Sequence, residues 1–101
     1  MKQFDIFKNL NDDTNSYIPY FLIVQHDILF HVTSCVVVPL VIDIKPSTHL
    51  NPIFEIENQQ VIMSTTEIVG VPRNILTQKV CSLKHKRVEI LNAIDFMITG
   101  F

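Results

Sequence analysis

The order of the apolar patterns constrains the fold of this chain most strongly: short strand-like segments come first and one helix-like segment comes last. Near the end of the chain, apolar residues recur at helical spacing and predict one buried stripe. Ser82 has a side chain that is typical of a helix N-cap, so we expect the helix to begin just after it. The stripe consists of Leu83, Ile90, Leu91, Ala93, Ile94, Met97 and Ile98.

Strand patterns fill the first three quarters of the chain, where β-branched and aromatic residues are frequent. Residues 21–24 have no polar break, which predicts a strand covered on both faces. Pro39 lacks an amide hydrogen, so we expect it at a sheet edge or a bulge. The predicted strands are residues 3–7, 18–25, 32–42, 53–57, 60–64 and 68–71.

Polar segments separate these strands and predict loops over residues 10–16 and 43–52. Asn58 and Gln59 are expected to form the turn of a hairpin, and residues 74–83 fit no single pattern. The sequence therefore predicts one domain over residues 1–101, of the α+β class and mainly β, in which an antiparallel sheet is closed by a C-terminal helix.

Composition narrows the functional classes. Hydrophobic residues make up 48% of the chain and charged residues 18%, which excludes a disordered segment and suggests apolar surface covered by another subunit. The net charge is −2, and the only basic run is residues 84–87. Direct binding to a nucleic-acid backbone is therefore not expected as the main activity.

The sequence predicts a soluble, cytoplasmic protein without membrane contact. Residues 1–8 alternate in polarity, unlike a signal peptide. The longest apolar run, residues 35–42, is too short to span a bilayer. Cys35 and Cys81 have no CxxC spacing, so we expect two free thiols in a reducing compartment, with a disulfide as the alternative.

No motif for catalysis, for a metal or for a cofactor is present in the sequence. The chain has two glycines, so a glycine-rich phosphate loop is excluded. Its four histidines are scattered and lack metal-ligand spacing. His26 and Asp27 are adjacent, which on a strand directs them to opposite faces. We therefore expect no catalytic residue, no metal site and no cofactor.

Two aromatic residues near the end of the chain leave alternatives open. Gly100 and Phe101 combine a flexible residue with a large apolar one, which suits either insertion into a partner or folding back onto the domain. Phe96 falls on the polar side of the predicted helix, where it would contact its own domain or a partner.

An ordered set of short segments resembles a known protein family. Residues 92–101 read Asn-Ala-Ile-Asp-Phe-Met-Ile-Thr-Gly-Phe, and residues 37–40 read Val-Val-Pro-Leu. Residues 63–66 read Met-Ser-Thr-Thr, and residues 71–72 read Val-Pro. Together with residues 3–4, 21–25, 27–29 and 50–52, these segments make nearly the whole chain similar to the CcdB family, the toxins of plasmid and chromosomal toxin–antitoxin modules.

The resemblance implies a homodimer of SH3-like β-barrels, each with a C-terminal helix. It implies a non-enzymatic toxin that binds the GyrA subunit of DNA gyrase and traps the enzyme on cleaved DNA. A cognate CcdA-like antitoxin would neutralise the toxin through a disordered C-terminal segment. The toxin–antitoxin complex would also repress its own operon, with DNA contacted only by the antitoxin.

The resemblance also implies two sets of contact residues. Family members often have asparagine at Asp95, tryptophan at Thr99, isoleucine at Phe101 and an acidic residue at Ile23, so this chain departs from the family there. By position, the gyrase-binding residues would be Ile28, Leu29, Asp95, Thr99, Gly100 and Phe101. The antitoxin-binding residues would lie in two loops and include Lys8, Asn9, Asn11, Asp12, Asp43 and Lys45.

Two other functions remain as alternatives at this stage. Toxins that cleave mRNA have a related fold, but metal-free RNA cleavage needs an acid, a base and an arginine that converge. The only arginines are Arg73 and Arg87, and neither has an obvious acidic or histidine partner in the sequence. A dimeric relative without toxicity is the other alternative.

Overall fold

The computed structural model describes residues 1–29 and 31–100. Four short 3-10 helices connect the main elements: η1 (Asp27–Leu29), η2 (Thr65–Glu67), η3 (Arg73–Ile75) and η4 (Lys84–Lys86). The strands and the helix are β1 (Asp5–Lys8), β2 (Tyr20–Ile23), β3 (Ser34–Val41), β4 (Ile53–Ile56), β5 (Gln59–Met63), β6 (Val69–Pro72), β7 (Lys79–Ser82) and α1 (Arg87–Thr99).

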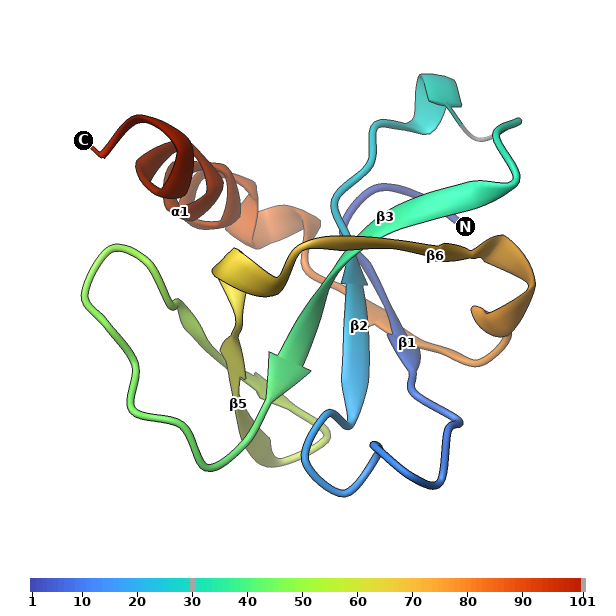
Figure 1. The fold of residues 1–101 in the computed structure, drawn as a ribbon, viewed down its shortest axis with the longest axis horizontal. Helices are drawn as coiled ribbons and strands as arrows, with labels where there is room; N and C mark the ends of the chain where they lie inside the picture. Colours follow the sequence, from blue (N-terminus) through green and yellow to red (C-terminus); the bar gives the residue numbers. More distant parts are fainter. Residues whose placement is uncertain (30, 101) are drawn as a thin grey trace.

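The strands form one bent antiparallel sheet in the order β4-β5-β3-β2-β1-β7, and β6 also pairs with β3 (Figure 1). The first half of β3 pairs with β6 and its last residues pair with β5. This branching curls the sheet into a half-barrel, and α1 lies beside it. The predicted class, α+β and mainly β with an SH3-like barrel and a C-terminal helix, is confirmed.

Pro39 lies in the middle of β3 and not at an edge or a bulge, so that prediction was wrong. On one side it pairs with Phe21 of β2. On the other side its carbonyl accepts a hydrogen bond of 2.9 Å from the amide of Ser64. Because a residue's N and O point to the same side of a strand, the missing N–H faces the gap where β3 changes partner from β6 to β5. No ladder bond is lost there.

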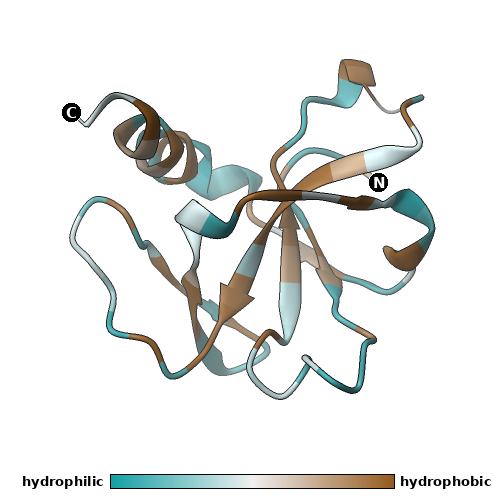
Figure 2. Ribbon diagram, in the orientation of Figure 1, coloured by the Kyte–Doolittle hydropathy of each residue, from teal (hydrophilic) through white to brown (hydrophobic). Residues whose placement is uncertain are grey.

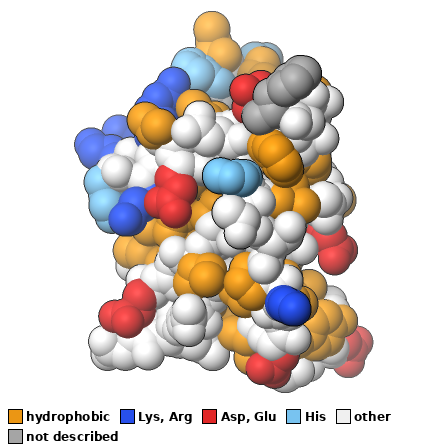
Figure 3. All heavy atoms as spheres, turned by 90° about the vertical axis from the view of Figure 1, so that its left-hand side faces the viewer, with side chains coloured by type: hydrophobic (Ala, Val, Ile, Leu, Met, Phe, Trp, Pro, Cys, Tyr) orange, Lys and Arg blue, Asp and Glu red, His pale blue; other side chains and the backbone are white. Residues whose placement is uncertain are grey.

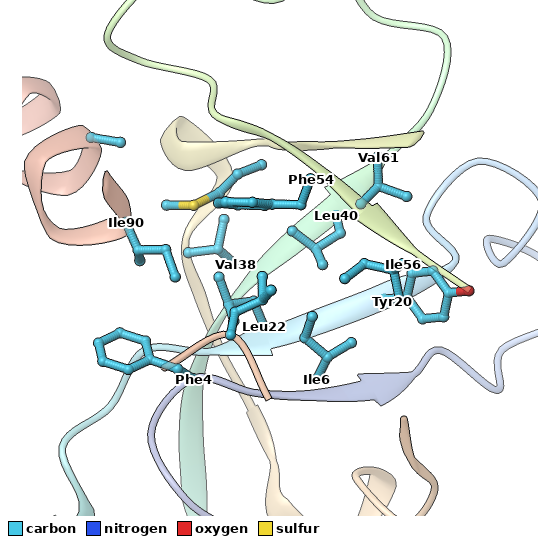
Figure 4. Close-up of a cluster of buried hydrophobic side chains, with 13 residues drawn as sticks. Phe4, Ile6, Tyr20, Leu22, Val38, Leu40, Phe54, Ile56, Val61 and Ile90 are labelled. Carbon is cyan, nitrogen blue, oxygen red and sulfur yellow. The ribbon is translucent and has the colours of Figure 1, made fainter. Parts of the chain in front are cut away.

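Hydrophobic side chains pack on both faces of the sheet, and Figure 2 shows β3 and β6 as largely hydrophobic segments among polar loops. Leu22 faces the larger cluster and Ile23 faces the smaller one, which confirms that β2 is covered on both sides. The larger cluster includes Phe4, Ile6, Tyr20, Leu22, Val38, Leu40, Phe54, Ile56, Val61, Met63 and Ile90 (Figure 4). The smaller one contains Phe7, Ile23, Cys35, Val37 and Leu76.

The helix begins later than the sequence suggested. Ser82 still belongs to the β-ladder, where it pairs with Asp5, so the backbone cannot turn into a helix at that point. Its Oγ instead accepts a hydrogen bond of 3.2 Å from the amide of Lys84, at the start of η4. α1 follows with Lys86 as its N-cap, which makes no side-chain capping bond. The prediction of Ser82 as the helix N-cap was therefore wrong.

The buried stripe of α1 is narrower than predicted. Ile90 and Ala93 are fully buried, and Ile90 projects from α1 toward Val38 and Leu22 (Figure 4). Ile98 is 74% exposed, because the last turn of α1 extends past the sheet (Figure 1). The assignment of Ile98 to the buried stripe was therefore wrong.

The β4–β5 hairpin turns one residue earlier than predicted. Glu57 and Asn58, with φ of 51° and 62°, form a two-residue turn between the paired residues Ile56 and Gln59. Positive φ at both central residues is what the tight twist of such a hairpin requires. The ambiguous residues 74–83 contain the end of η3 and strand β7, which joins the sheet beside β1.

Candidate functional site

The first predicted contact group begins just after β2. Ile28 and Leu29 lie in η1 and are 71% and 45% exposed. The amide of Ile28 donates to Nδ1 of His26 at 3.1 Å, and the amide of Leu29 donates to the His26 carbonyl at 3.0 Å. Asp27 Oδ1 accepts a 2.6 Å bond from the amide of Gln3. Local hydrogen bonds therefore hold two large apolar side chains in solvent.

The second part of this group is the end of α1. Asp95 and Thr99 are both exposed, and the Thr99 hydroxyl donates to the Asp95 carbonyl at 2.8 Å. Gly100 has φ of 77°, and its amide donates to the Phe96 carbonyl at 2.8 Å. This left-handed C-cap suits glycine because a Cβ would be strained there. Phe101, also predicted as a contact residue, lies outside the described residues.

These two parts do not form one surface within a single chain. Figure 1 shows η1 and the end of α1 on opposite sides of the molecule, with β3 and β6 between them. The structure does bring Asp95, Thr99 and Gly100 together on the last turns of α1. Any site that uses both parts needs either a large target or a second copy of the chain.

The predicted antitoxin-facing residues surround a buried asparagine in the β1–β2 loop. Asn9 is 6% exposed. Its Nδ2 donates to Thr14 Oγ1 and to the Ile18 carbonyl, both at 2.9 Å, and its Oδ1 accepts from the Asn11 amide at 3.0 Å. Asn9 therefore organises the loop from inside, whereas Lys8, Asn11 and Asp12 are exposed on it.

The β3–β4 loop carries the remaining predicted residues. Asp43 and Lys45 are exposed, and Asp43 has a positive φ of 63°. The amide of Ile42 donates to the Tyr17 carbonyl at 3.1 Å, which joins this loop to the β1–β2 loop. The structure thus brings the two predicted loops to the same end of the sheet.

A groove between the β3–β4 loop and α1 was not predicted from the sequence. It has a volume of about 600 Å³. Figure 3 views this side, where hydrophobic side chains are interspersed with acidic, basic and histidine side chains. Phe96 lies in the groove against His49, with ring centroids 5.8 Å apart, so it does contact its own domain. The signal in the sequence was Phe96 itself, on the polar side of the helix.

The ionisable groups with shifted pKa values are buried or half-buried and do not form a reactive cluster. Burial, reinforced by a 2.6 Å hydrogen bond to Glu57 Oε1, raises the pKa of Tyr20 to about 12. Burial also raises the pKa of the Cys35 and Cys81 thiols, which disfavours the reactive thiolate. Both cysteines are free thiols, which settles the alternative of a disulfide.

Both arginines make local contacts, but the buried Nη2 of Arg73 has no hydrogen-bond partner among the described residues. Nε of Arg73 donates to the Val32 carbonyl at 3.0 Å, and Nη1 of Arg87 donates to Gln3 Oε1 at 3.4 Å. The Arg87 guanidinium also lies 5.8 Å from the ring centroid of Phe4. Among residues 1–29 and 31–100, no group of three or more His, Cys, Asp or Glu side chains could hold a metal ion.

No helix in the described part of the chain is both long enough and apolar enough to cross a membrane. A comparison with protein families matches the chain to the family described as CcdB protein, over residues 3–100. The match includes β1 to β7, α1 and both groups of predicted contact residues except Phe101. The chain therefore belongs to the CcdB family, toxins of toxin–antitoxin modules that poison DNA gyrase and are not themselves catalysts.

Proposed function

We propose that this protein binds the GyrA subunit of DNA gyrase and traps the complex of gyrase with cleaved DNA. The observation that carries the proposal is the exposed last turn of α1, which presents Asp95, Thr99 and Gly100 beyond the sheet. Family membership over residues 3–100 supports the choice of gyrase as the target.

The geometry of α1 favours tight binding to a rigid target. Ile90 and Ala93 fix the helix on the sheet, so its last turn loses little freedom when it binds. Ile98 adds an exposed apolar side chain next to Thr99. Phe101, which follows the left-handed Gly100, is proposed as the apolar group that enters the target.

We propose that the active form is a homodimer. The two parts of the contact group, η1 and the end of α1, lie on opposite sides of one chain. A symmetric dimer would present each part twice to the symmetric gyrase, and two linked contacts bind more tightly than one. The exposed apolar residues Ile98 on α1 and Val69 on β6 are consistent with a covering subunit.

The proposed neutralising partner is a CcdA-like antitoxin whose disordered C-terminal segment binds the joined β1–β2 and β3–β4 loops. Lys8, Asn11, Asp12, Asp43 and Lys45 would contact it, and buried Asn9 would hold the loop in shape. With the antitoxin contacting DNA, the complex would repress its own operon. Both proposed activities would require the protein to be in the bacterial cytoplasm, where gyrase and the operon are found.

Cleavage of mRNA is the second candidate, and the described residues give it little support. Arg73 and Arg87 are held by local contacts. Without a metal, RNA cleavage needs an acid, a base and a cation aimed at one phosphate. His26, Asp27 and Arg73 do line one hollow, but its volume of about 10 Å³ leaves room for about one water molecule and not for a phosphate.

A single assay separates these functions. Purified protein is incubated with gyrase and supercoiled plasmid, and in parallel with an RNA substrate. Linear DNA that appears only with gyrase supports gyrase poisoning, whereas cut RNA would support the endoribonuclease. If neither product forms, a non-toxic dimeric relative is the remaining candidate.

Variants at the end of α1 test the proposed surface. Deletion of Gly100 and Phe101 should abolish trapping while the circular dichroism spectrum and the dimer persist. Thr99→Trp should increase trapping about tenfold, because a tryptophan is a strong apolar contact at interfaces. Thr77→Ala, at an exposed position before β7, is the matched control and should trap normally. A truncated protein that fails to fold would show that these residues belong to the core.

A further inference from the structure

A group of basic side chains at the start of α1 takes no part in the surfaces described above. Lys84, His85 and Lys86 form η4, and Arg87 is the first residue of α1. All four are exposed. Figure 3 shows basic and histidine side chains grouped along one edge of the molecule in that view. We refer to residues 84–87 as the basic run.

The chain's own carboxylates do not neutralise the basic run. Among the described residues, Lys84, Lys86 and Arg87 have no ion-pair partner. Asp5 lies on β1 beside the end of β7, but it is 3% exposed and its Oδ1 is 3.4 Å from Nζ of Lys79. An anionic partner would therefore meet uncompensated cations.

The carboxylate that follows the basic run on α1 faces away from it. Glu89 lines the groove beside the β3–β4 loop. Arg87 extends in another direction, where its guanidinium lies 5.8 Å from the ring centroid of Phe4. Successive residues of an α-helix turn by about 100°, so positions two apart lie on opposite sides. Glu89 therefore leaves the charge of the basic run exposed to a partner.

The position of the basic run is unfavourable for the stability of α1. The N-terminal end of a helix carries partial positive charge, so cations destabilise it and anions stabilise it. Lys86 is the N-cap residue and makes no side-chain capping bond. The last turn of α1, where cations would be favourable, has none. The basic run therefore lowers the stability of the fold unless an anion binds to it.

Among anionic partners, a nucleic-acid backbone matches the basic run best. Three cations within four residues suit a dense polyanion, and duplex DNA carries about one negative charge per 1.7 Å of its axis. A membrane surface is less suitable, because lipid binding also uses exposed aromatic or leucine side chains. Leu83, next to the run, is 5% exposed, and the run itself contains no aromatic or aliphatic residue.

We propose that the basic run binds the phosphate backbone of duplex DNA, and that in the trapped complex it contacts the DNA that gyrase holds. The 13 residues of α1 span about 20 Å, with the basic run at the start and Thr99 at the end. One helix can thus contact the enzyme and its DNA together, and linked contacts strengthen each other. The binding of DNA rests on the basic run, whereas its place in the trapped complex rests on the proposed gyrase function.

DNA binding by the full chain alone tests the first part of the proposal. The probe is a fluorescein-labelled duplex of about 20 base pairs, used in several unrelated sequences at about 50 mM salt and followed by fluorescence anisotropy. Binding should be weak and independent of sequence. The logarithm of the association constant should fall against the logarithm of the salt concentration with a slope of about −2 or steeper. Absence of binding, or a slope near zero, would overturn the assignment.

A matched pair of double variants tests the location. Lys84→Gln with Lys86→Gln should weaken duplex binding about tenfold and make the salt slope shallower by about 2. Lys8→Gln with Lys45→Gln removes the same charge from exposed positions in other loops and should leave binding nearly unchanged. Equal losses in the two variants would mean that the whole surface, and not the basic run, attracts DNA. Arg87 is left in place because it contacts Phe4.

Two further measurements exclude other roles for the two lysines. The midpoint of urea denaturation should stay the same or rise in Lys84→Gln with Lys86→Gln, because both cations oppose the helix dipole. A clearly lower midpoint would show that the lysines support the fold and would overturn the proposal. Vesicles of phosphatidylcholine with phosphatidylserine, and a labelled poly-glutamate peptide, are compared with the duplex. Tighter binding of either one would assign the basic run to lipid or to an acidic protein.

Gyrase assays separate this inference from the proposed function. Lys84→Gln with Lys86→Gln should bind the GyrA subunit in the absence of DNA as the wild-type protein does. The same variant should need several-fold more protein to trap gyrase on plasmid DNA. Weaker binding to GyrA alone, or unchanged trapping, would overturn the contact with gyrase-held DNA. If the wild-type protein binds the duplex and does not trap gyrase, the proposed toxin function fails while the DNA-binding surface stands.

Discussion

The end of α1 and the β1–β2 loop both present exposed residues that we propose as partner contacts, but different forces hold them in place. α1 is held by apolar burial, with Ile90 and Ala93 inaccessible to solvent. The loop is held by hydrogen bonds that converge on Asn9. Each region thus contains residues that secure its shape and exposed residues that we propose as contacts.

This difference predicts how much stability each region loses when a supporting residue is substituted. Burial of a large aliphatic side chain stabilises a fold by several kcal/mol, because its removal leaves a cavity. A hydrogen bond in a loop contributes about 1 kcal/mol, because the unfolded chain makes equivalent bonds to water. Loss of the support for α1 should therefore affect the whole fold, whereas loss of the support for the loop should act mainly on the loop.

The largest expected effect is at Ile90. Ile90→Ala removes a fully buried side chain between α1 and the sheet. It should lower the free energy of unfolding by about 2 to 5 kcal/mol, measured by urea denaturation. Val88→Ala on the same helix is the control, because Val88 is 71% exposed, and it should change stability by less than about 0.5 kcal/mol. Equal effects at both positions would mean that α1 is not held by its inner face.

Tyr20 is the first residue of β2, next to the β1–β2 loop, and its hydroxyl donates a hydrogen bond to Glu57. It tests how much this polar interaction contributes to stability. The pKa of Tyr20 rises from 10.0 to about 12 on folding, chiefly through burial and then through Glu57. Between these values the unfolded chain loses the proton and the folded chain keeps it. Stability from Tyr20 is therefore complete below about pH 10 and is lost as the pH rises toward 12, by at most about 3 kcal/mol.

The measurement is urea denaturation at several pH values between about 8 and 12, on the wild-type protein and on Tyr20→Phe. Phenylalanine cannot ionise, so the difference between the two curves isolates Tyr20. At neutral pH the variant should lose only about 1 kcal/mol, the value of one hydrogen bond. Parallel curves over the whole range would contradict the shifted pKa.

Asn9 tests the support of the loop itself. Asn9→Ala leaves the Ile18 carbonyl and the Asn11 amide without their side-chain partner. We expect stability to fall by about 1 to 3 kcal/mol, measured by urea denaturation, and hydrogen exchange to rise in residues 9–19 but not in α1. Asp12→Ala is the matched exposed control and should change neither quantity. Faster exchange in α1 as well would show that the two regions are coupled and would break the comparison.

Sequence reasoning predicted the parts of the fold that depend on patterns. The strands with β-branched runs and the apolar stripe around Ile90 follow from periodicity, and the family resemblance supplied the barrel. Pro39 was misplaced because its neighbours belong to β5 and β6, more than twenty residues away in sequence. Ser82 was misplaced because its pairing with Asp5 is equally remote. Local sequence does not show which backbone groups a distant strand will occupy.

The residues of the candidate site likewise divide into those whose placement the sequence could predict and those whose placement it could not. Exposure of Ile28 and Leu29 could be proposed only from the resemblance, since two adjacent aliphatic residues normally indicate a core. The burial of Asn9 could not be predicted, because asparagine in a polar segment usually indicates an exposed turn. The groove between the β3–β4 loop and α1 was missed because its lining residues come from that loop, β4 and α1, and only the folded chain brings them together.

Gly100 gives the smallest expected effect. It tests whether, at the end of α1, the residues that hold the fold are separate from the residues that we propose as contacts. Gly100→Ala forces a Cβ into a left-handed conformation with φ of 77°, which should cost about 1 kcal/mol. No described atom lies within 4 Å of that Cβ, so the cost is conformational and not steric contact with the rest of the fold. Because the turn is exposed, the helix can fray there without disturbing Ile90. The free energy of unfolding should therefore fall by less than about 1 kcal/mol, while gyrase trapping falls several-fold through the altered direction of the chain after Thr99.

Gly100→Asn, which tolerates positive φ better, should recover much of the trapping. A loss of stability as large as that of Ile90→Ala would show that the end of α1 supports the fold and does not only present contacts.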